Sequence, residues 1–433
     1  MNKIFLLAFL FIAHSVQAQL SSDEKKIIEY VNSHLAESEQ LLIESVNINS
    51  GTLNTEGVKK VGAVYRRELD KLGFLTEWVS LPDSLRRAGH LVATRKGTRG
   101  KRLFLLGHLD TVFELDMLFS PYTKLTDSTA TGQGVNDMKG GNVVIISALK
   151  ALNSLGLLNN TQIITYFTGD EESSGSPHHI ARQDLIERAR TTDIALGFEG
   201  AQGLNTVAVA RRGIGGWVLN VTAKTGHSAG IFGEGVGYGA IYEAARIING
   251  FRTELKDEKY LTFNPGLISG GAEIKVEPEH AKTEAIGKTN IISPVVYVAG
   301  DLRFISDSQK EKAREKMRAI VAQSLNGTSS SISFSDGLPA MEPAEGNYRL
   351  VRFLDGITKD IGIGPTRAGD PGARGAGDIS DIAKYVDSVD GLGASGSGSH
   401  KPGEVINLRE YPYLIQRAAL LIYRLTRDNP VLK

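Results

Sequence analysis

The sequence predicts an α/β protein in which a second domain, with an antiparallel sheet, is inserted into the first. Short apolar runs alternate with helical segments up to residue 212, half-exposed strands follow, and helices return after residue 333. Such alternation of buried strands and helices is typical of an α/β sheet with helices on both faces. The length of 433 residues, with 23% charged and 41% hydrophobic residues, excludes a disordered chain and a polytopic membrane protein.

The first domain, residues 19–212, begins with helical patterns at 23–49 and 58–72, where apolar residues recur at helical spacing. Short apolar runs bounded by Gly and polar residues predict buried strands at residues 91–94, 103–106, 163–167 and 195–198. A further helix is predicted at 141–155.

The inserted domain, residues 213–333, has a β-α-β-β-α pattern. Strands are predicted at residues 217–221, 261–268 and 295–304, and helices at 239–255 and 308–325. Residues 334–433 then return to helices and short strands, and they end in a strong helix at 411–425 that we expect to pack on the first domain. The Gly- and Ser-rich stretch 391–399 is interpreted as a mobile site loop, because it directly precedes a His.

The N-terminus has the features of a secretory signal peptide. Lys3 is followed by an apolar run over residues 4–13, and Val16-Gln17-Ala18 offers small residues at the cleavage positions. We therefore expect residues 1–18 to be removed and the protein to be exported, either to the periplasm or to the medium. The alternative is an uncleaved anchor, but the apolar run is short for a permanent membrane span. No other segment indicates a membrane association.

Composition narrows the possible chemistry. The chain has 49 basic residues (Lys and Arg together) and 49 acidic residues (Asp and Glu together). The basic excess expected of a nucleic-acid-binding protein is therefore absent. There is no Cys, which excludes disulfides, thiolate nucleophiles and Cys-ligated zinc. Any metal ion must therefore be held by His, Asp and Glu.

Five short segments concentrate these residue types, and most of them follow a predicted strand. They contain His108 and Asp110, Asp137, Glu171 and Glu172, Glu199, and His400. In open α/β sheets, ligands bind at the carboxyl edge of the strands, so residues from separate segments can converge there. A group of His and carboxylates is costly unless its charge is compensated, and a divalent cation does this well.

Each residue type suggests a role. His108 can ligate a metal, and Asp110, two residues later on the same face of an extended chain, can accept the other imidazole N–H. Asp137 can bridge two metals, while Glu199 and His400 complete the coordination. The adjacent side chains of Glu171 and Glu172 point apart, so one can bind metal while the other acts as a general base. Taken singly, each segment is also compatible with an ordinary surface pair, and only their combination indicates a site.

The chain resembles a family of metallopeptidases and deacylases that includes glutamate carboxypeptidase, succinyl-diaminopimelate desuccinylase and the aminoacylases. The resemblance rests on His-x-Asp-Thr-Val from His108, Gly-x-Asn-Asp-Met-Lys-Gly-Gly around Asp137, and Asp-Glu-Glu at 170–172, and it spans about residues 23–430. It implies a zinc-exopeptidase-like domain, with a mixed sheet between helices, and an inserted α+β ferredoxin-like domain that serves as a lid and in dimer formation.

The resemblance also implies two zinc ions per subunit, although cobalt or manganese would suit the same donors. One zinc would be held by His108, Asp137 and Glu199, and the other by Asp137, Glu172 and His400. Glu171 would be the general base, Asp110 would orient His108, and the peptide bond after Asp137 would be cis. Glu rather than Asp at position 199 favours the carboxypeptidase and deacylase branches.

In the inserted domain, the resemblance implies that His227 donates to the oxyanion in the site of a partner subunit, so a homodimer is expected. Asn290 and Arg303 match positions that bind the substrate carboxylate. Two departures stand out. Residues 335–339 lack the basic residues of glutamate carboxypeptidases, and Arg374 precedes a looser Gly-rich hairpin, where it is either an anion contact or a surface residue.

These observations favour an exported zinc-dependent metallopeptidase, similar to glutamate carboxypeptidase. It would cleave an amide bond next to a free carboxylate in small peptides or N-acyl amino acids, by attack of a metal-activated hydroxide with Glu171 as base. An aminoacylase or amidohydrolase acting on a non-peptide amide is the first alternative. An inactive, metal-dependent binding protein is the second, and the presence of all the expected ligands and the base argues against it.

Overall fold

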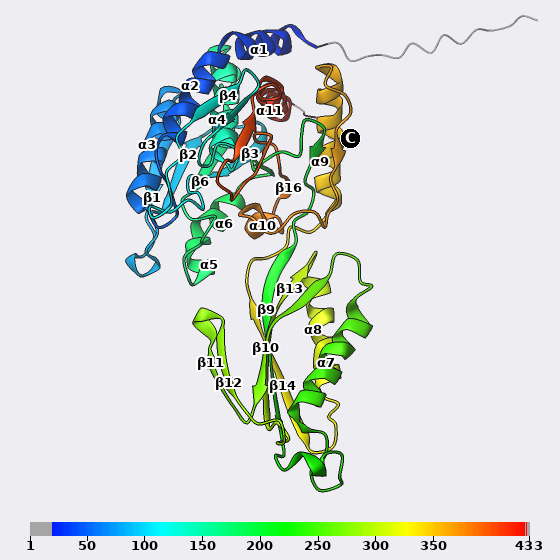
Figure 1. Cartoon of the computed structure of the whole chain (residues 1–433). Helices are drawn as coiled ribbons and strands as arrows, with labels where there is room; N and C mark the ends of the chain where they lie inside the picture. Colours follow the sequence, from blue (N-terminus) through cyan, green and yellow to red (C-terminus); the bar gives the residue numbers. More distant parts are fainter. Residues whose placement is uncertain (1–19, 429, 431–433) are drawn as a thin grey trace, which may run out of the picture.

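The computed structural model describes residues 20–428 and 430, and the predicted signal peptide lies outside them. Figure 1 shows two domains, with the inserted domain extending away from the first. The first domain is built on a six-stranded sheet with the order β1-β2-β6-β3-β7-β16. Its strands are β1 (Leu75–Val79), β2 (His90–Arg95), β3 (Arg99–His108), β6 (Thr161–Thr168), β7 (Ile194–Gly197) and β16 (Asp387–Val389). None of the helices in residues 20–428 is long and apolar enough to cross a bilayer.

The four strands β6, β3, β7 and β16 run parallel, whereas β1 and β2 pair antiparallel at one edge, so the sheet is mixed as expected. Successive residues of these strands enter two separate apolar cores. Leu103 and Leu105 pack on one face, and Phe104 and Leu106 on the other. Burial on both faces explains why these strands have continuous apolar sequences rather than alternating ones.

Helices cover both faces of this sheet. One face packs on the larger group of helices, which is α1 (Ser22–Ser33), α2 (Leu35–Val46), α3 (Thr55–Lys71), α4 (Lys139–Ser154), α9 (Glu345–Asp360) and α11 (Tyr411–Thr426). The other face is covered by the short helices α6 (Gln183–Ala189) and α10 (Ile379–Ile382), with α5 (His178–Ala181) nearby. The C-terminal helix α11 packs against α4 and α1, which confirms the expected return of the chain to the first domain.

The inserted domain has an antiparallel sheet with the order β10-β13-β9-β14. Its strands are β9 (Gly213–Ala223), β10 (Thr262–Gly271), β13 (Val295–Phe304) and β14 (Thr328–Asp336), and its helices are α7 (Gly239–Leu255) and α8 (Asp307–Val321). Trp217, Phe251 and Val298 lie in its separate apolar core. A hairpin of β11 (Glu273–Glu277) and β12 (Lys282–Ile286) stands beside the sheet (Figure 1).

Small elements complete the chain. A four-stranded sheet contains β4 (Thr123–Thr126), β5 (Thr129–Thr131), β17 (Gly396–Ser397) and β18 (Val405–Asn407), and β8 (Thr206–Val207) pairs with β15 (Arg367–Ala368). Three 3₁₀ helices are η1 (Asp83–Leu85), η2 (Ser228–Gly230) and η3 (Pro278–His280). The pairing of β18 with β5 brings residues far apart in sequence side by side, next to the segment that carries Asp137.

Some expected elements differ. The helical pattern over 23–49 is two helices, because the chain breaks at His34, which has φ −116° and ψ 21°. The strands β1 and β14 were not predicted. Both are edge strands, and the sequence of β14 is largely polar. The stretch 391–399 is only partly an exposed loop, because Leu392 and Ala394 are fully buried. The last strand of the inserted sheet continues to Asp336, slightly past residue 333.

Candidate active site

The predicted site residues converge at the carboxyl edge of the parallel strands. His108 ends β3, Glu171 and Glu172 follow β6, and Glu199 follows β7. Asp137 lies just before α4, and His400 lies in the turn between β17 and β18. Together with Arg211 and Arg374, most of these residues line one cleft of about 560 Å³.

His108, Asp137 and Glu199 form the first group of potential metal ligands. The Nε2 atom of His108 lies 3.2 Å from Asp137 Oδ1 and 3.3 Å from Glu199 Oε1. The peptide bond between Asp137 and Met138 is cis, as the resemblance implies. His108 is 1% exposed, so its environment is set by these carboxylates rather than by solvent.

Asp137, Glu172 and His400 form the second group. His400 Nε2 lies 3.2 Å from Asp137 Oδ2 and 3.1 Å from Glu172 Oε2. The two oxygens of Asp137 therefore face two different imidazoles. Two donors bound to one tetrahedral zinc at roughly 2.0–2.1 Å are about 3.3 Å apart. The spacing of these side chains thus fits a pair of metal ions that share Asp137.

Asp110 lies beneath this cluster and is fully buried. Its carboxylate accepts hydrogen bonds from Thr52 Oγ1 and from the backbone N–H groups of Glu171 and Glu172, at 2.6, 3.0 and 3.1 Å. His108 Nδ1 lies 3.0 Å from the backbone oxygen of Asp110 and 3.4 Å from its Oδ1. Asp110 therefore contacts both His108 and the loop that carries Glu171, although the backbone oxygen is the closer acceptor for the imidazole.

Glu171 belongs to neither of the two groups that share Asp137, although with His108 and Glu172 it forms a third set of possible ligands. Burial, followed by the negative charge of Glu199, raises the pKa of Glu171 well above its usual value. A raised pKa is what a carboxylate needs to accept a proton near neutral pH. A Cβ atom on Gly377 would lie 3.3 Å from Glu171 Oε1, so the Gly-rich hairpin packs directly against this side chain.

Neighbouring carboxylates raise the pKa of both imidazoles. Burial acts to lower the pKa of His108, but hydrogen bonds to Asp110, Asp137 and Glu199 raise it well above its usual value. Hydrogen bonds to Asp137 and Glu172 raise the pKa of His400 to about 11. Ligation requires a neutral imidazole, so a metal ion must compete with protons for these ring nitrogens.

We predict that metal binding releases protons. With a pKa of about 11, His400 is protonated at neutral pH without metal, so the ion that it ligates must displace a proton. Affinity should rise with pH by about tenfold per unit for each proton displaced. Calorimetric titration with Zn²⁺ in two buffers of different protonation enthalpy measures this release. Equal heats in both buffers, with an affinity that is constant between about pH 6 and 8, would contradict it.

Comparison with known proteins identifies the family. The sequence model of peptidase family M20/M25/M40 matches residues 104–424. The chain belongs to this family. As an M20 member it is a metallo-exopeptidase of a family with a dinuclear metal site, and the two groups that share Asp137 are candidate ligands for such a site.

Carboxypeptidase G2 of Pseudomonas sp. (strain RS-16) is 29% identical over 386 residues, which cover 87% of this chain and 86% of that protein. Solved M20 structures share the fold at low identity. An aminopeptidase of Bacillus cereus has a TM-score of 0.72 and 17% identity, over 90% of this chain and 98% of its own. A dinuclear metal binding M20 peptidase of Bacillus subtilis has a TM-score of 0.61 and 14% identity, over 91% of this chain and 99% of its own.

Two buried groups support this M20 site but were not assigned roles from the sequence. The Glu404 carboxylate accepts hydrogen bonds from the backbone N–H groups of Gly134, Asn136 and Asp137, at 3.0, 2.7 and 2.7 Å. It thereby ties the segment after His400 to the segment that carries Asp137. Its position four residues after His400, in the same loop, is a signal that could have identified it.

Arg182 is the centre of the second buried group. It donates to Asp170 at 2.6 Å and to Asp378 at 2.8 Å, and it is 1% exposed. These bonds fasten the Asp-Glu-Glu loop to the Gly-rich hairpin. No sequence pattern indicates that Arg182, within a helical segment, faces inward.

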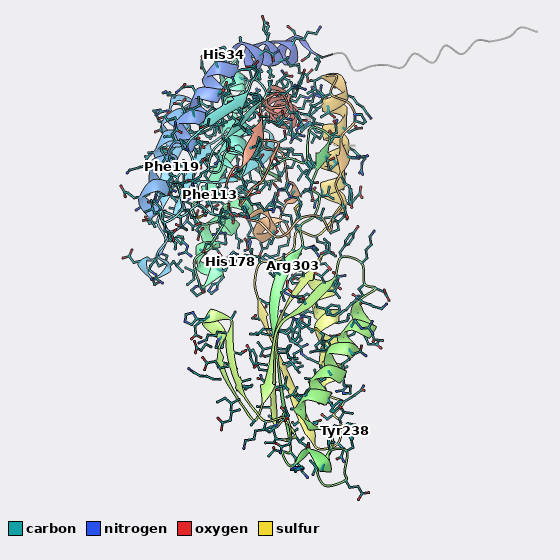
Figure 2. All side chains as sticks on the ribbon, viewed as in Figure 1. His34, Phe113, Phe119, His178, Tyr238 and Arg303 are labelled. Carbon is teal, nitrogen blue, oxygen red and sulfur yellow. The ribbon has the colours of Figure 1, made fainter. Side chains whose placement is uncertain are left out.

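The three predicted substrate-binding residues do not lie together. His227 and Asn290 are exposed, and Ser228 N donates to Asn290 O at 3.0 Å in the loop region that follows β9, at the far end of the inserted domain in Figure 1. Arg303 lies instead at the junction of the domains, where Figure 2 labels it, and pairs with Asp301 at 3.0 Å. Within one chain, His227 and Asn290 are thus separated from the metal ligands.

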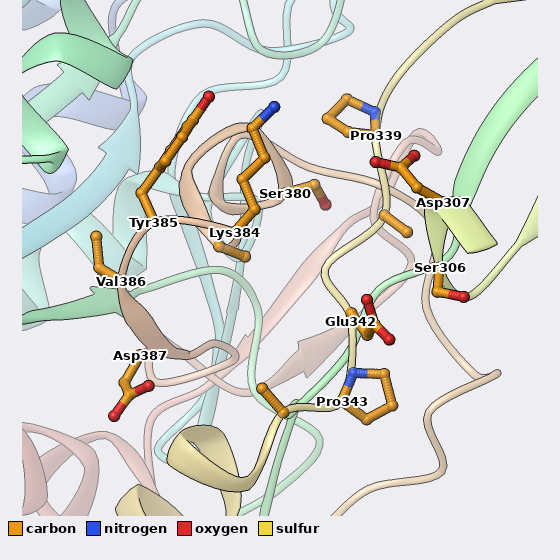
Figure 3. Close-up of a pocket in the computed structure, with 13 residues that line it drawn as sticks. Ser306, Asp307, Pro339, Glu342, Pro343, Ser380, Lys384, Tyr385, Val386 and Asp387 are labelled. Atoms are coloured by element: carbon orange, nitrogen blue, oxygen red, sulfur yellow. The ribbon is translucent and has the colours of Figure 1, made fainter.

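A different pocket of about 460 Å³ lies at the junction of the two domains (Figure 3). Asp307, Glu342, Lys384 and Tyr385 are among the residues that line it. None of the ligand groups found among the described residues includes a residue of this pocket. The candidate ligand groups therefore point to the cleft beside His400 rather than to this pocket.

Proposed function

We propose that this M20 peptidase is a zinc-dependent enzyme of the carboxypeptidase type, which hydrolyses an amide bond next to a free carboxylate in small peptides or N-acyl amino acids. The observation that supports this most strongly is the pair of ligand groups that share Asp137, with Glu171 beside them and outside both. Its likeness to carboxypeptidase G2 over most of the chain favours the same type of reaction.

His108, Asp137 and Glu199 would hold one zinc, and Asp137, Glu172 and His400 the other. Bound zinc would polarise the scissile carbonyl and acidify the attacking water. Glu171 takes a proton from that water and later passes it to the leaving amine. Asp110 holds the loop of Glu171 through two backbone N–H groups, so the base stays in place while its protonation state changes.

A homodimer would supply His227 to the site of the partner subunit, where it would donate to the developing oxyanion. An exposed aromatic cluster on the inserted domain supports this part of the proposal. Phe232, Tyr238 and Tyr242 pack on one another with ring centroids 5.3 and 5.4 Å apart, yet Phe232 is 56% and Tyr242 is 52% exposed. Clustered exposed aromatics are typical of protein interfaces.

We predict that Tyr242→Arg yields a monomer. The substitution places a charge within the aromatic cluster, which an interface core disfavours. Sedimentation velocity at micromolar concentration measures the effect, and Tyr413→Arg, at a site that is 40% exposed on α11, is the matched control. If the wild-type protein is itself a monomer at these concentrations, the dimer proposal fails.

We also propose that the protein is exported after removal of residues 1–18. The motif Val16-Gln17-Ala18 supports this, and those residues lie outside the described part of the structure. N-terminal sequencing of the protein from periplasm and medium should give a chain that begins at Gln19. A chain that retains Met1 in the cytoplasm would contradict export.

The reaction itself is tested with a library of dipeptides and N-acyl amino acids, assayed on zinc-loaded protein. Hydrolysis of members with a free carboxylate, and at least a tenfold lower rate on their carboxamides, is the expected result. Activity only on non-peptide amides without a carboxylate would favour the amidohydrolase alternative. Tight binding of library members without any hydrolysis would favour a binding protein.

A further inference from the structure

The cleft contains two guanidinium groups that the metal site does not require. Arg211 and Arg374 line it together with Glu171, Glu199 and His400. Both lie on the side of Glu199, and they come from different parts of the chain, one just before β9 and the other in the segment that follows β15. Their bonding differs, and this difference indicates separate roles.

Arg211 is held by the protein through two of its three guanidinium nitrogens. Its Nε donates to Asp390 at 2.5 Å, and its Nη1 donates to the backbone oxygens of Gly375 and Ala376 at 3.3 and 3.1 Å. The remaining nitrogen, Nη2, lies 3.3 Å from Glu199 Oε2. The residue lines the cleft but is only 4% exposed, so little of its guanidinium is open to a ligand. Arg211 is therefore part of the cleft wall, and its Nη2 faces the Oε2 atom of Glu199.

Arg374 is not engaged in this way. Among the described residues its one side-chain hydrogen bond runs from Nη1 to the backbone oxygen of Gly200, at 2.6 Å. Its Nη2 lies 3.9 Å from Glu199 Oε2, beyond hydrogen-bonding distance, and that oxygen already faces Arg211. The side chain is 18% exposed toward the cleft. One edge of this guanidinium is thus free to bind a ligand.

The electrostatic setting favours an anion at that edge. Burial, and then the positive charge of Arg211, lower the pKa of Arg374, because both destabilise its charged form. Arginine nevertheless remains protonated in proteins. Asp390 already pairs with Arg211, and the carboxylate of Glu199 already lies close to His108 and Arg211. A carboxylate from outside would therefore give Arg374 a charged partner that the chain does not supply.

We propose that Arg374 binds the substrate carboxylate next to the scissile amide, which deepens the proposed function and rests on it. The carboxylate carbon and the scissile carbonyl carbon of an N-acyl amino acid are three bonds apart, on the order of 3–4 Å. A carboxylate held at Nη2, itself 3.9 Å from Glu199, places the amide above the ligand groups. A guanidinium is suited to this because its planar fork can bind a carboxylate through two parallel hydrogen bonds.

Arg303, which the family resemblance favours for the same task, is the alternative anchor. It pairs with Asp301 at 3.0 Å and projects from the inserted domain. Arg374, by contrast, belongs to the same domain as the metal ligands, so its distance from Glu199 does not depend on the position of the inserted domain. A carboxylate anchor at Arg374 would be present in each chain by itself.

The proposal is tested by equilibrium binding, which does not depend on turnover. 4-Phenylbutanoate has a carboxylate but no amide bond to cleave and no amine, and its carboxamide is the neutral comparison. We expect the zinc-loaded protein to bind the acid at least tenfold more tightly than the carboxamide. Arg374→Gln should weaken binding of the acid about 30-fold and leave the carboxamide unchanged, while Arg374→Lys restores part of the affinity.

Arg367→Gln is the matched control, since Arg367 is an exposed arginine on the nearby strand β15. Metal content should equal that of the wild type in all variants, because Arg374 contacts no metal directly. The proposal is overturned if Arg374→Gln binds the acid as the wild type does, if the wild type does not prefer the acid, or if only Arg303→Gln removes the preference. Lack of hydrolysis across the substrate library would instead contradict the proposed function.

Discussion

Glu171→Ala should abolish turnover while the protein keeps its metal. General base catalysis typically contributes a factor of about 10²–10⁴, and here the same carboxylate must also return the proton to the leaving amine. We therefore expect kcat to fall by about three to four orders of magnitude. Glu171 lies outside the two ligand groups that share Asp137, so metal analysis should still find two ions per chain.

Two further variants make this result specific. Glu171→Gln keeps the volume of the side chain against Gly377 and should be equally inactive, which separates lost proton transfer from disturbed packing. Glu56→Ala changes an exposed glutamate at the start of α3 and should be fully active. Activity within tenfold of the wild type in Glu171→Gln would mean that another group is the base.

Asp137→Asn should remove both metals together. The two oxygens of Asp137 lie 3.2 Å from His108 and 3.2 Å from His400, so this one carboxylate serves both ligand groups. An amide presents one weak oxygen donor and no charge, and loss of the bridge should reduce the metal content to less than one ion per chain after dialysis. We expect kcat/KM to fall by at least about 10³-fold as a consequence.

The controls for this variant separate lost charge from lost structure. Asp127→Asn, at an exposed position between β4 and β5, should bind two ions. Because metal binding stabilises the folded state, the thermal midpoint of the wild type should rise on addition of Zn²⁺, and that of Asp137→Asn should not. Retention of two tightly bound ions by Asp137→Asn would show that the bridge is not essential.

The ligand groups could be predicted because the chemistry is local to the sequence. Each strand end carries a compact motif, such as His108 with Asp110 or the Glu171-Glu172 pair, and parallel strands bring such ends to one edge. The same rule applies to Asp390, which follows β16 and pairs with Arg211, but β16 is only three residues long and gives no periodic signal. The contacts of Arg374 depend on packing between distant segments, and only the structure shows them.

The fold could be predicted from the sequence to a similar extent. Strands buried on both faces, such as β3 and β6, have continuous apolar sequences, and helices such as α7 have clear periodicity, with bounds that match the expected 239–255. Edge strands escape detection because their outer faces are polar. In β14 (Thr328–Asp336), for example, most positions are Ser, Thr or Asp.

The tie between Glu404 and the Asp137 segment has a consequence for how the enzyme is made. His400 and Glu404 lie late in the sequence. A ribosome-bound chain that ends before them lacks His400, which faces Asp137, and the carboxylate that binds the backbone of Asp137. The second ligand group, Asp137, Glu172 and His400, is thus complete only after His400 has been synthesised. If the chain crosses the membrane unfolded, its ions are drawn from the compartment in which it folds, and the cytoplasmic zinc pool has no part in choosing them.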